Sequence, residues 1–85
     1  MKKFIVYEWC TDDEGGLGVC LTNNYSDDVN NPLFDRTRDK IGEFNTVDEL
    51  AELLYNNNPE YYGSVSNAYE EDAKHLFNKC SCLED

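Results

Sequence analysis

Four cysteines are the residues of this sequence that could together hold a zinc ion. Nine residues separate Cys10 from Cys20, and one residue separates Cys80 from Cys82. Structural zinc sites usually separate paired cysteines by about two to four residues. Three alternatives remain open: a zinc site built from all four thiolates, a disulfide between Cys10 and Cys20, and free, partly buried thiols. The spacing favours free thiols, so we expect no metal and no cofactor.

Nucleophilic and acid–base catalysis have little support in the residue pattern. His75 is the single histidine, and it has no neighbouring serine or cysteine in a recognisable nucleophile–base motif. The glycine-rich run at 15–18 lacks the lysine and the helix start that a phosphate-binding loop needs. We therefore expect no catalytic residues and no enzymatic activity.

Carboxylates are the chemical groups that this sequence supplies in excess. The 85 residues carry 18 acidic side chains against seven lysines and arginines, which gives a formal net charge of −11 at pH 7. Seven acids and no base lie between Lys3 and Arg36, and eight acids and no base lie between Lys40 and Lys74. Such segregation creates surfaces of one sign, which attract positively charged partners over a Debye length of about 8 Å. The partner that we expect is a basic protein, whereas nucleic acids and anionic membranes would be repelled.

The residues that we expect to bind this partner are exposed acids and two tyrosines. Tyrosine combines a large apolar ring with a polar tip and often anchors interfaces. Tyr61 and Tyr62 lie in an expected turn, where both rings cannot easily point inward. The predicted partner-binding residues are Asp12, Asp13, Glu14, Asp27, Asp28, Asp48, Glu49, Glu52, Tyr61, Tyr62, Glu70, Glu71 and Asp72.

An N-terminal hairpin is expected to position the first group of acids. Residues 3–10 are rich in β-branched and aromatic types and read as a strand, and 17–22 read as the returning strand. The aspartates and glycines of 11–16 are typical of a turn. A register centred on this turn would place Cys10 opposite Cys20. We expect 23–40 to be a loop and 40–44 to be a short third strand.

Two helices are expected to position the remaining acids. Thr46 and Glu49 have the spacing of a capping box, and an apolar stripe over 47–54 predicts a helix that ends before Pro59. A second helix should begin near 64–67 and end near Lys79, with its own apolar stripe. The expected fold is α+β: one domain over 1–85, in which a small antiparallel sheet packs on two C-terminal helices. Hydrophobic content of 40% is too high for an acidic disordered tail.

The N-terminus shows no targeting pattern. The apolar run after Lys2 and Lys3 is only four residues long before Glu8. A secretory signal needs about 7 to 15 apolar residues, and a membrane-spanning helix needs about 20. We therefore expect the protein in the cytoplasm.

Residues 42–71 carry a local resemblance to a known family. This segment resembles the first helix and following loop of the barstar family. The resemblance is carried by the Gly42-Glu43 pair, the 46–50 run Thr-Val-Asp-Glu-Leu, the 59–63 run Pro-Glu-Tyr-Tyr-Gly and Ala68. Barstars are small acidic cytoplasmic inhibitors of basic ribonucleases, and their inhibitory helix plugs the nuclease active site. The resemblance places the family's inhibitory acids at Asn67 and Glu71, of which only the second is acidic here.

In length, charge and α+β character the chain also resembles a broader class, the small acidic inhibitors that phages encode against bacterial defence nucleases. This anti-CRISPR and anti-restriction class implies a DNA mimic that occludes the basic nucleic-acid-binding surface of a nuclease or CRISPR effector, in the host cytoplasm if the protein is phage-encoded. The alternative is a small phage or bacterial structural or assembly protein that acts through an aromatic protein–protein interface, for example as a homodimer.

Overall fold

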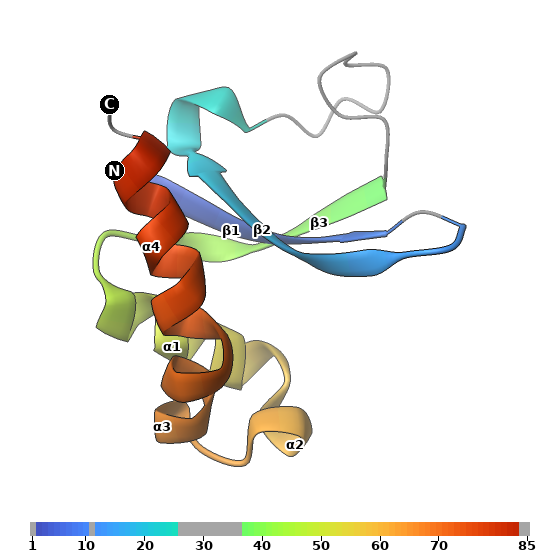
Figure 1. Ribbon diagram of the computed structural model, residues 1–85, viewed down its shortest axis with the longest axis vertical. Helices are drawn as coiled ribbons and strands as arrows, with labels where there is room; N and C mark the ends of the chain where they lie inside the picture. The colour runs from blue at the N-terminus through green and yellow to red at the C-terminus, as the bar shows by residue number, and fades with distance from the viewer. Residues whose placement is uncertain (1, 11, 26–36, 84–85) are drawn as a thin grey trace.

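The computed structural model describes residues 2–10, 12–25 and 37–83. A three-stranded antiparallel sheet packs on the helices of the second half of the chain, so the predicted α+β class is confirmed (Figure 1). The elements are β1 (Phe4–Cys10), β2 (Gly15–Leu21), the 3-10 helix η1 (Thr22–Asn24), β3 (Thr37–Phe44), α1 (Val47–Asn57), α2 (Pro59–Tyr62), α3 (Val65–Ala68), the π-helical segment η2 (Tyr69–Ala73) and α4 (Lys74–Leu83).

The hairpin of β1 and β2 has a different register from the predicted one. Cys10 pairs with Gly15, and Cys20 pairs with Ile5, so the expectation that the two cysteines face each other is wrong. The cause is that Gly15, Gly16 and Gly18 belong to strand β2 rather than to the turn. A Cβ atom added at Gly18 would lie 2.6 Å from the ring of Tyr7, and glycine therefore makes room for this aromatic side chain.

Strand β3 is longer than predicted, because it begins at Thr37 rather than at Lys40. Its pairing with β1 shifts between Val6 and Tyr7, where Gly42 and Lys40 are the partners and Ile41 is the extra residue of a bulge. A bulge reverses the alternation of side chains between the two faces. The period of two that identifies a strand is therefore broken in the middle of β3.

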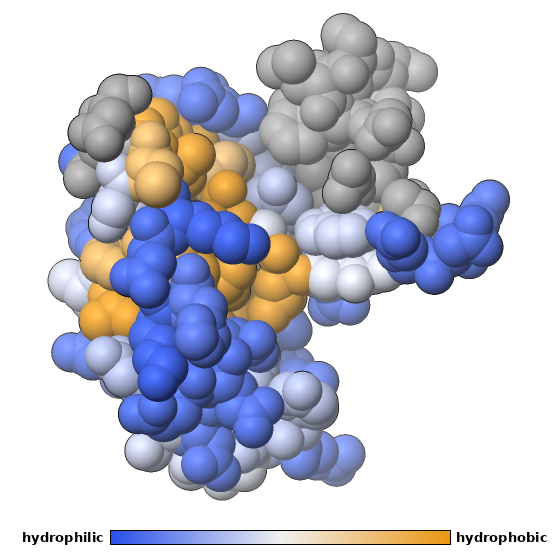
Figure 2. All heavy atoms as spheres, viewed as in Figure 1, coloured by the Kyte–Doolittle hydropathy of each residue, from blue (hydrophilic) through white to orange (hydrophobic). Residues whose placement is uncertain are grey.

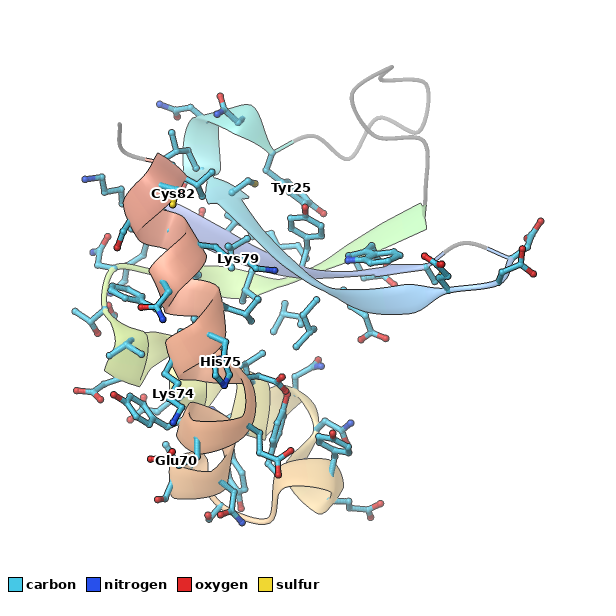
Figure 3. All side chains as sticks on the ribbon, in the orientation of Figure 1. Tyr25, Glu70, Lys74, His75, Lys79 and Cys82 are labelled. Carbon is cyan, nitrogen blue, oxygen red and sulfur yellow. The ribbon has the colours of Figure 1, made fainter. Side chains whose placement is uncertain are left out.

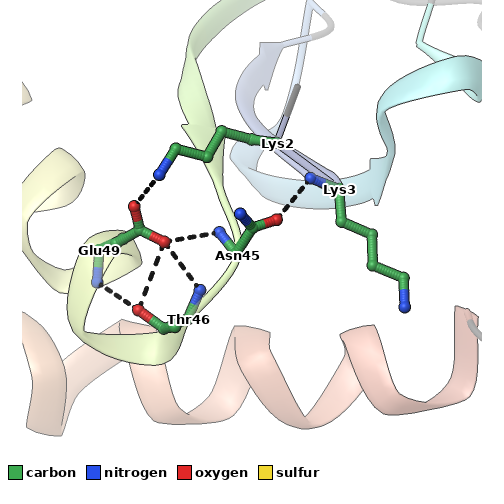
Figure 4. Close-up of polar contacts among 5 residues, drawn as sticks. All are labelled: Lys2, Lys3, Asn45, Thr46 and Glu49. Atoms are coloured by element: carbon green, nitrogen blue, oxygen red, sulfur yellow. Dashed lines mark hydrogen bonds and ion pairs between the residues drawn. The ribbon is translucent and has the colours of Figure 1, made fainter.

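Helix α1 begins with the predicted capping box, which the structure confirms. Thr46 Oγ1 accepts a hydrogen bond from the Glu49 N–H at 3.2 Å, and Glu49 Oε1 accepts one from the Thr46 N–H at 3.2 Å (Figure 4). The same carboxylate accepts hydrogen bonds from the Asn45 N–H, at 2.9 Å, and from Lys2 Nζ. The contact with Lys2 has the largest effect on the carboxyl, and together these contacts lower the pKa of Glu49 to about 2.

The segment after α1 is more helical than expected. Residues 59–62, predicted as part of the inter-helix turn, form the short helix α2, which ends at Gly63 with a left-handed φ of 81°. Ser64 then caps α3 by accepting a hydrogen bond from the Asn67 N–H at 3.1 Å. A continuous helical run leads through η2 to the end of α4. Its π-helical turn lets Ala68 and Ala73, five residues apart, both be fully buried.

The hydrophobic core lies between the helices and only one end of the sheet. Phe4, Phe44 and Phe77 form a ring cluster with centroid separations of 5.5 to 6.4 Å, and Val6 and Leu50 are fully buried beside it. The other end of the hairpin extends beyond the helix layer as an arm (Figure 1). In the described part of the chain no helix has both the length and the apolar character needed to cross a membrane.

Candidate functional site

A groove of about 660 Å³ separates the projecting arm from the helices, and we call it the hairpin groove. One wall is formed by residues of β1 and β2 between Glu8 and Leu17. The other wall is formed by the end of α1, by α2, by η2 and by the first half of α4. Figure 2 shows this hollow between the hydrophilic hairpin tip and the hydrophilic helices, with an apolar patch at its inner end.

Glu8 lies on the strand wall of the groove and was missed as a candidate in the sequence. It shares one face of β1 with Phe4 and Val6, which are buried against the helices, whereas Glu8 is exposed. A carboxylate at a core-facing position of a strand marks the point where the covering layer ends. The alternation of side chains along β1, which places Glu8 on the same face as Phe4 and Val6, was the signal available in the sequence. It identifies a groove only when the helices are known to end before Glu8.

Tyr61 and Tyr62 have different roles. Tyr62 is buried, and its hydroxyl donates a hydrogen bond to Asp72 Oδ2 at 2.5 Å. Burial, and then this bond to a carboxylate, raises the pKa of the Tyr62 phenol. Tyr61 packs edge-on against the Tyr62 ring, at a centroid distance of 4.8 Å, and stays 65% exposed at the groove. Of the two predicted interface tyrosines, the structure makes Tyr61 available on the surface and places Tyr62 in the core.

The three consecutive acids of η2 point in different directions. Glu71 and Asp72 line the groove. Glu70 lies outside the groove and pairs with Lys74 Nζ at 2.7 Å, which lowers the pKa of the Glu70 carboxyl (Figure 3). Because side chains radiate around a helix axis, three neighbours in sequence cannot share one face. Asp72 accepts the Tyr62 hydroxyl, so Glu71 is the acid of this run that is most available to a partner.

The predicted acids of α1 lie away from the groove. Glu49 is used in the capping box and by Lys2. Asp48 and Glu52 are one helical turn apart and line a separate hollow with Val65 and Tyr69. At about 100° per residue, this face of α1 is opposite the one that carries Leu54 and Asn57 into the groove.

Asp12, Asp13 and Glu14 are exposed at the tip of the arm, next to the outer end of the groove. Asp27 and Asp28 lie outside the described residues. The predicted acids therefore do not form one surface. Among the described residues these acids lie at the hairpin tip, on the groove wall and on the outer face of α1, whereas Glu49 lies at the start of α1 and Glu70 lies outside the groove.

No disulfide joins the four cysteines, of which Cys20 and Cys80 are buried and Cys10 and Cys82 are exposed. The disulfide alternative between Cys10 and Cys20 is therefore wrong, for the same reason as the register. Across residues 2–10, 12–25 and 37–83, no three histidine, cysteine or acidic side chains come close enough to hold a metal ion. His75 is exposed on α4 and lines the groove together with Lys79.

The charge of the groove is negative. Glu8, Glu71 and Asp72 supply three carboxylates, and Lys79 is the one lysine or arginine among the described residues that line it. An exposed tyrosine and apolar side chains such as Leu17 lie between these charges. This combination suits a cationic group with an apolar stem, such as a lysine or arginine side chain.

Comparison of the chain with known protein families, curated proteins and solved structures found no significant match. The resemblances to the barstar family and to the phage-encoded inhibitors therefore stay predictions.

Proposed function

We propose that this protein is an acidic cytoplasmic inhibitor that occludes the basic nucleic-acid-binding surface of a nuclease or CRISPR effector, its carboxylates taking the place of phosphates. The observation that carries the proposal is the arm, which presents Asp12, Asp13 and Glu14 at an exposed tip beside an acidic groove. A formal net charge of −11 supports a basic partner over plain solubility, for which a magnitude of about 2 to 8 is enough.

Carboxylates can substitute for phosphates because both accept paired hydrogen bonds from arginine. A basic nucleic-acid-binding cleft holds several such cations, and an acidic surface that enters the cleft gains their attraction and excludes the nucleic acid. Tyr61 would supply the aromatic anchor that protein interfaces often use.

The test is competition for DNA. The protein is added to complexes between labelled DNA and a panel of purified nucleases and CRISPR effectors, and release of the DNA is measured by fluorescence anisotropy. We expect release by the wild-type protein and weaker release by the Asp12→Asn/Asp13→Asn variant. The control Asp48→Asn/Glu52→Gln removes the same charge from the outer face of α1 and should act like the wild type.

Salt dependence gives a second measure of the same proposal. If carboxylates replace phosphate contacts, affinity for the target should fall steeply between about 50 and 200 mM salt, because salt screens the attraction between the two surfaces. Affinity that stays constant across this range, or equal loss of activity in the tip and α1 variants, would contradict the charge-based mechanism.

The alternative, an aromatic interface in a structural or assembly protein, has one observation in its favour. Tyr61 and Val65 are the large hydrophobic residues that stay exposed in the described chain, at 65% and 39%. A dimer that forms without a nuclease, persists at high salt and dissociates on Tyr61→Ala would favour this alternative. Sedimentation velocity measures all three properties.

A further inference from the structure

Strand β2 is an edge strand, because the sheet order is β2-β1-β3. The Thr22 N–H donates to the Lys3 carbonyl at 2.9 Å, and these residues continue the register of the hairpin. In an antiparallel pair, hydrogen-bonded and non-bonded positions alternate. The main-chain N–H and C=O groups therefore point toward β1 at Cys20, Gly18 and Gly16. At Leu17 and Gly15 these groups point away from β1.

Gly15 and Leu17 border the hairpin groove, and their outward backbone groups lie along the edge of the sheet beside it. Both residues line it, and among the described residues that line it none belongs to β3. Farther along β2, Val19 and Leu21 pack on the core, where α4 meets the strand. Among the described residues no strand pairs with this edge of β2, which borders the groove at Gly15 and Leu17. Such an edge is a template for one more strand.

Charge decides which kind of strand fits. An added strand would lie beside β2 at the edge of the sheet, and its side chains on the groove side would face Leu17 and the far wall that carries Tyr61 and Glu71. Arginine side chains match this surface, since their stems pack on apolar and aromatic groups and their guanidinium groups pair with carboxylates. A second copy of this chain does not match it, because it would bring another charge of −11 and another acidic tip to the same place.

We propose that the β2 edge at Gly15–Leu17 binds an extended segment of the partner as a fourth, antiparallel strand, with arginines or lysines at alternate positions facing the hairpin groove. The proposal rests on the proposed function in taking the partner to be a basic protein. It adds the binding mode: main-chain hydrogen bonds to β2 and cationic side chains in the groove.

The probe for this site is a blocked synthetic peptide of alternating arginine and valine. With arginine facing the groove, the arginine N–H groups point at β2 and the valine N–H groups point to solvent. We expect micromolar-range or weaker binding by NMR titration, with slower hydrogen exchange at the Gly15 and Leu17 amides of the protein. A peptide N-methylated at its arginines should lose this protection, and one N-methylated at its valines should keep it.

Two variants test the contribution of charge. Glu71→Gln removes a groove carboxylate and should weaken peptide binding by about threefold to fivefold, in line with an exposed ion pair. Glu52→Gln removes the same charge from the outer face of α1 and should leave binding unchanged.

Three results would overturn the inference: no binding of the unmethylated peptide at low salt, equal binding of both methylated peptides, or protection of the Gly15 and Leu17 amides that depends on protein concentration without peptide. Either of the first two results would show that the peptide does not pair with β2 as a strand. The third result would show that a second copy of the protein binds this edge. None of them decides the DNA competition, so the proposed function and this binding mode fail separately.

Discussion

At the scale of single residues, Glu49 joins three parts of the chain. Its carboxylate closes the start of α1 by accepting the Asn45 and Thr46 N–H groups, and it also binds Lys2, which precedes β1 (Figure 4). Asn45 adds a second link, because its side-chain oxygen accepts the Lys3 N–H at 2.7 Å. Glu49 was predicted both as a helix-capping residue and as a partner-binding acid. In the structure Glu49 acts as the helix-capping residue.

Glu49→Gln should separate the charge of this residue from its capping geometry. Glutamine also serves in a capping box, but it cannot form the ion pair with Lys2. Because the pKa of Glu49 is lowered in the folded state from 4.5 to about 2, its charge stabilises the fold above about pH 4.5, and this contribution is lost as the pH falls toward 2. We expect the variant to melt at a lower temperature than wild type at pH 7, with a smaller difference at about pH 3.

Thermal denaturation followed by circular dichroism measures this difference. Glu52→Gln, at an exposed position of the same helix, is the matched control and should show no comparable pH dependence. A melting difference for Glu49→Gln that is as large at pH 3 as at pH 7 would show that its charge does not stabilise the fold.

At the scale of elements, Gly42 allows α1 to pack closely on β3. A Cβ atom added at Gly42 would lie 2.6 Å from one methyl carbon of Leu53 and 3.1 Å from the other. Gly42 does not have a positive φ, so alanine would meet a steric obstacle there and no backbone strain. The glycine is thus a packing residue, in a strand where the residue type by itself suggests a turn or a bulge.

Gly42→Ala should destabilise the protein by about 1 to 2 kcal/mol, because Leu53 has to move out of its position. For a chain of this size, 1 kcal/mol corresponds to a fall in Tm of about 4 to 8 °C. In a Leu53→Ala background the same substitution should have a much smaller effect, since the obstructing methyl groups are absent. Equal effects in both backgrounds, measured by urea denaturation, would show that the contact with Leu53 is not the cause.

Elements that depend on short-range patterns could be predicted from the sequence, and the contacts between them could not. The capping box at Thr46 and the stripe of α1 were predicted because both arise within one helix. The register of the hairpin was not, because glycines that make room for Tyr7 look the same in a sequence as glycines in a turn. The bulge at Ile41 in β3 was missed because it breaks the alternation on which strand prediction depends.

At the scale of the whole molecule, negative charge is spread over surfaces that face different ways. Ion pairs join Lys2 to Glu49, Lys40 to Glu43 and Lys74 to Glu70. All six side chains are partly exposed, so each of these pairs stabilises the fold only modestly and does not offset the large excess of carboxylates. Repulsion among the excess carboxylates therefore acts against the folded state.

Salt should consequently stabilise this protein. Raising the ionic strength from about 0.01 to 0.15 M shortens the Debye length from about 30 to 8 Å and screens the repulsion between distant carboxylates. We expect Tm at pH 7 to rise with sodium chloride over this range, and to rise less in Asp12→Asn/Asp13→Asn, which begins with less repulsion. A Tm that falls with salt, measured by calorimetry, would mean that attractive pairs dominate the electrostatics of the fold.

The sequence by itself determined the α+β class, the excess of negative charge and the local signals for strands and helix caps. These properties follow from residue types and from hydrogen bonds that span a few residues. The tertiary structure decided which side chains share a surface. It joined Glu8, Tyr61 and Glu71 in the hairpin groove, placed Asp48 and Glu52 on another face, and buried Tyr62. The physical reason is that burial and proximity depend on where the helix layer ends on the sheet, which no single element specifies.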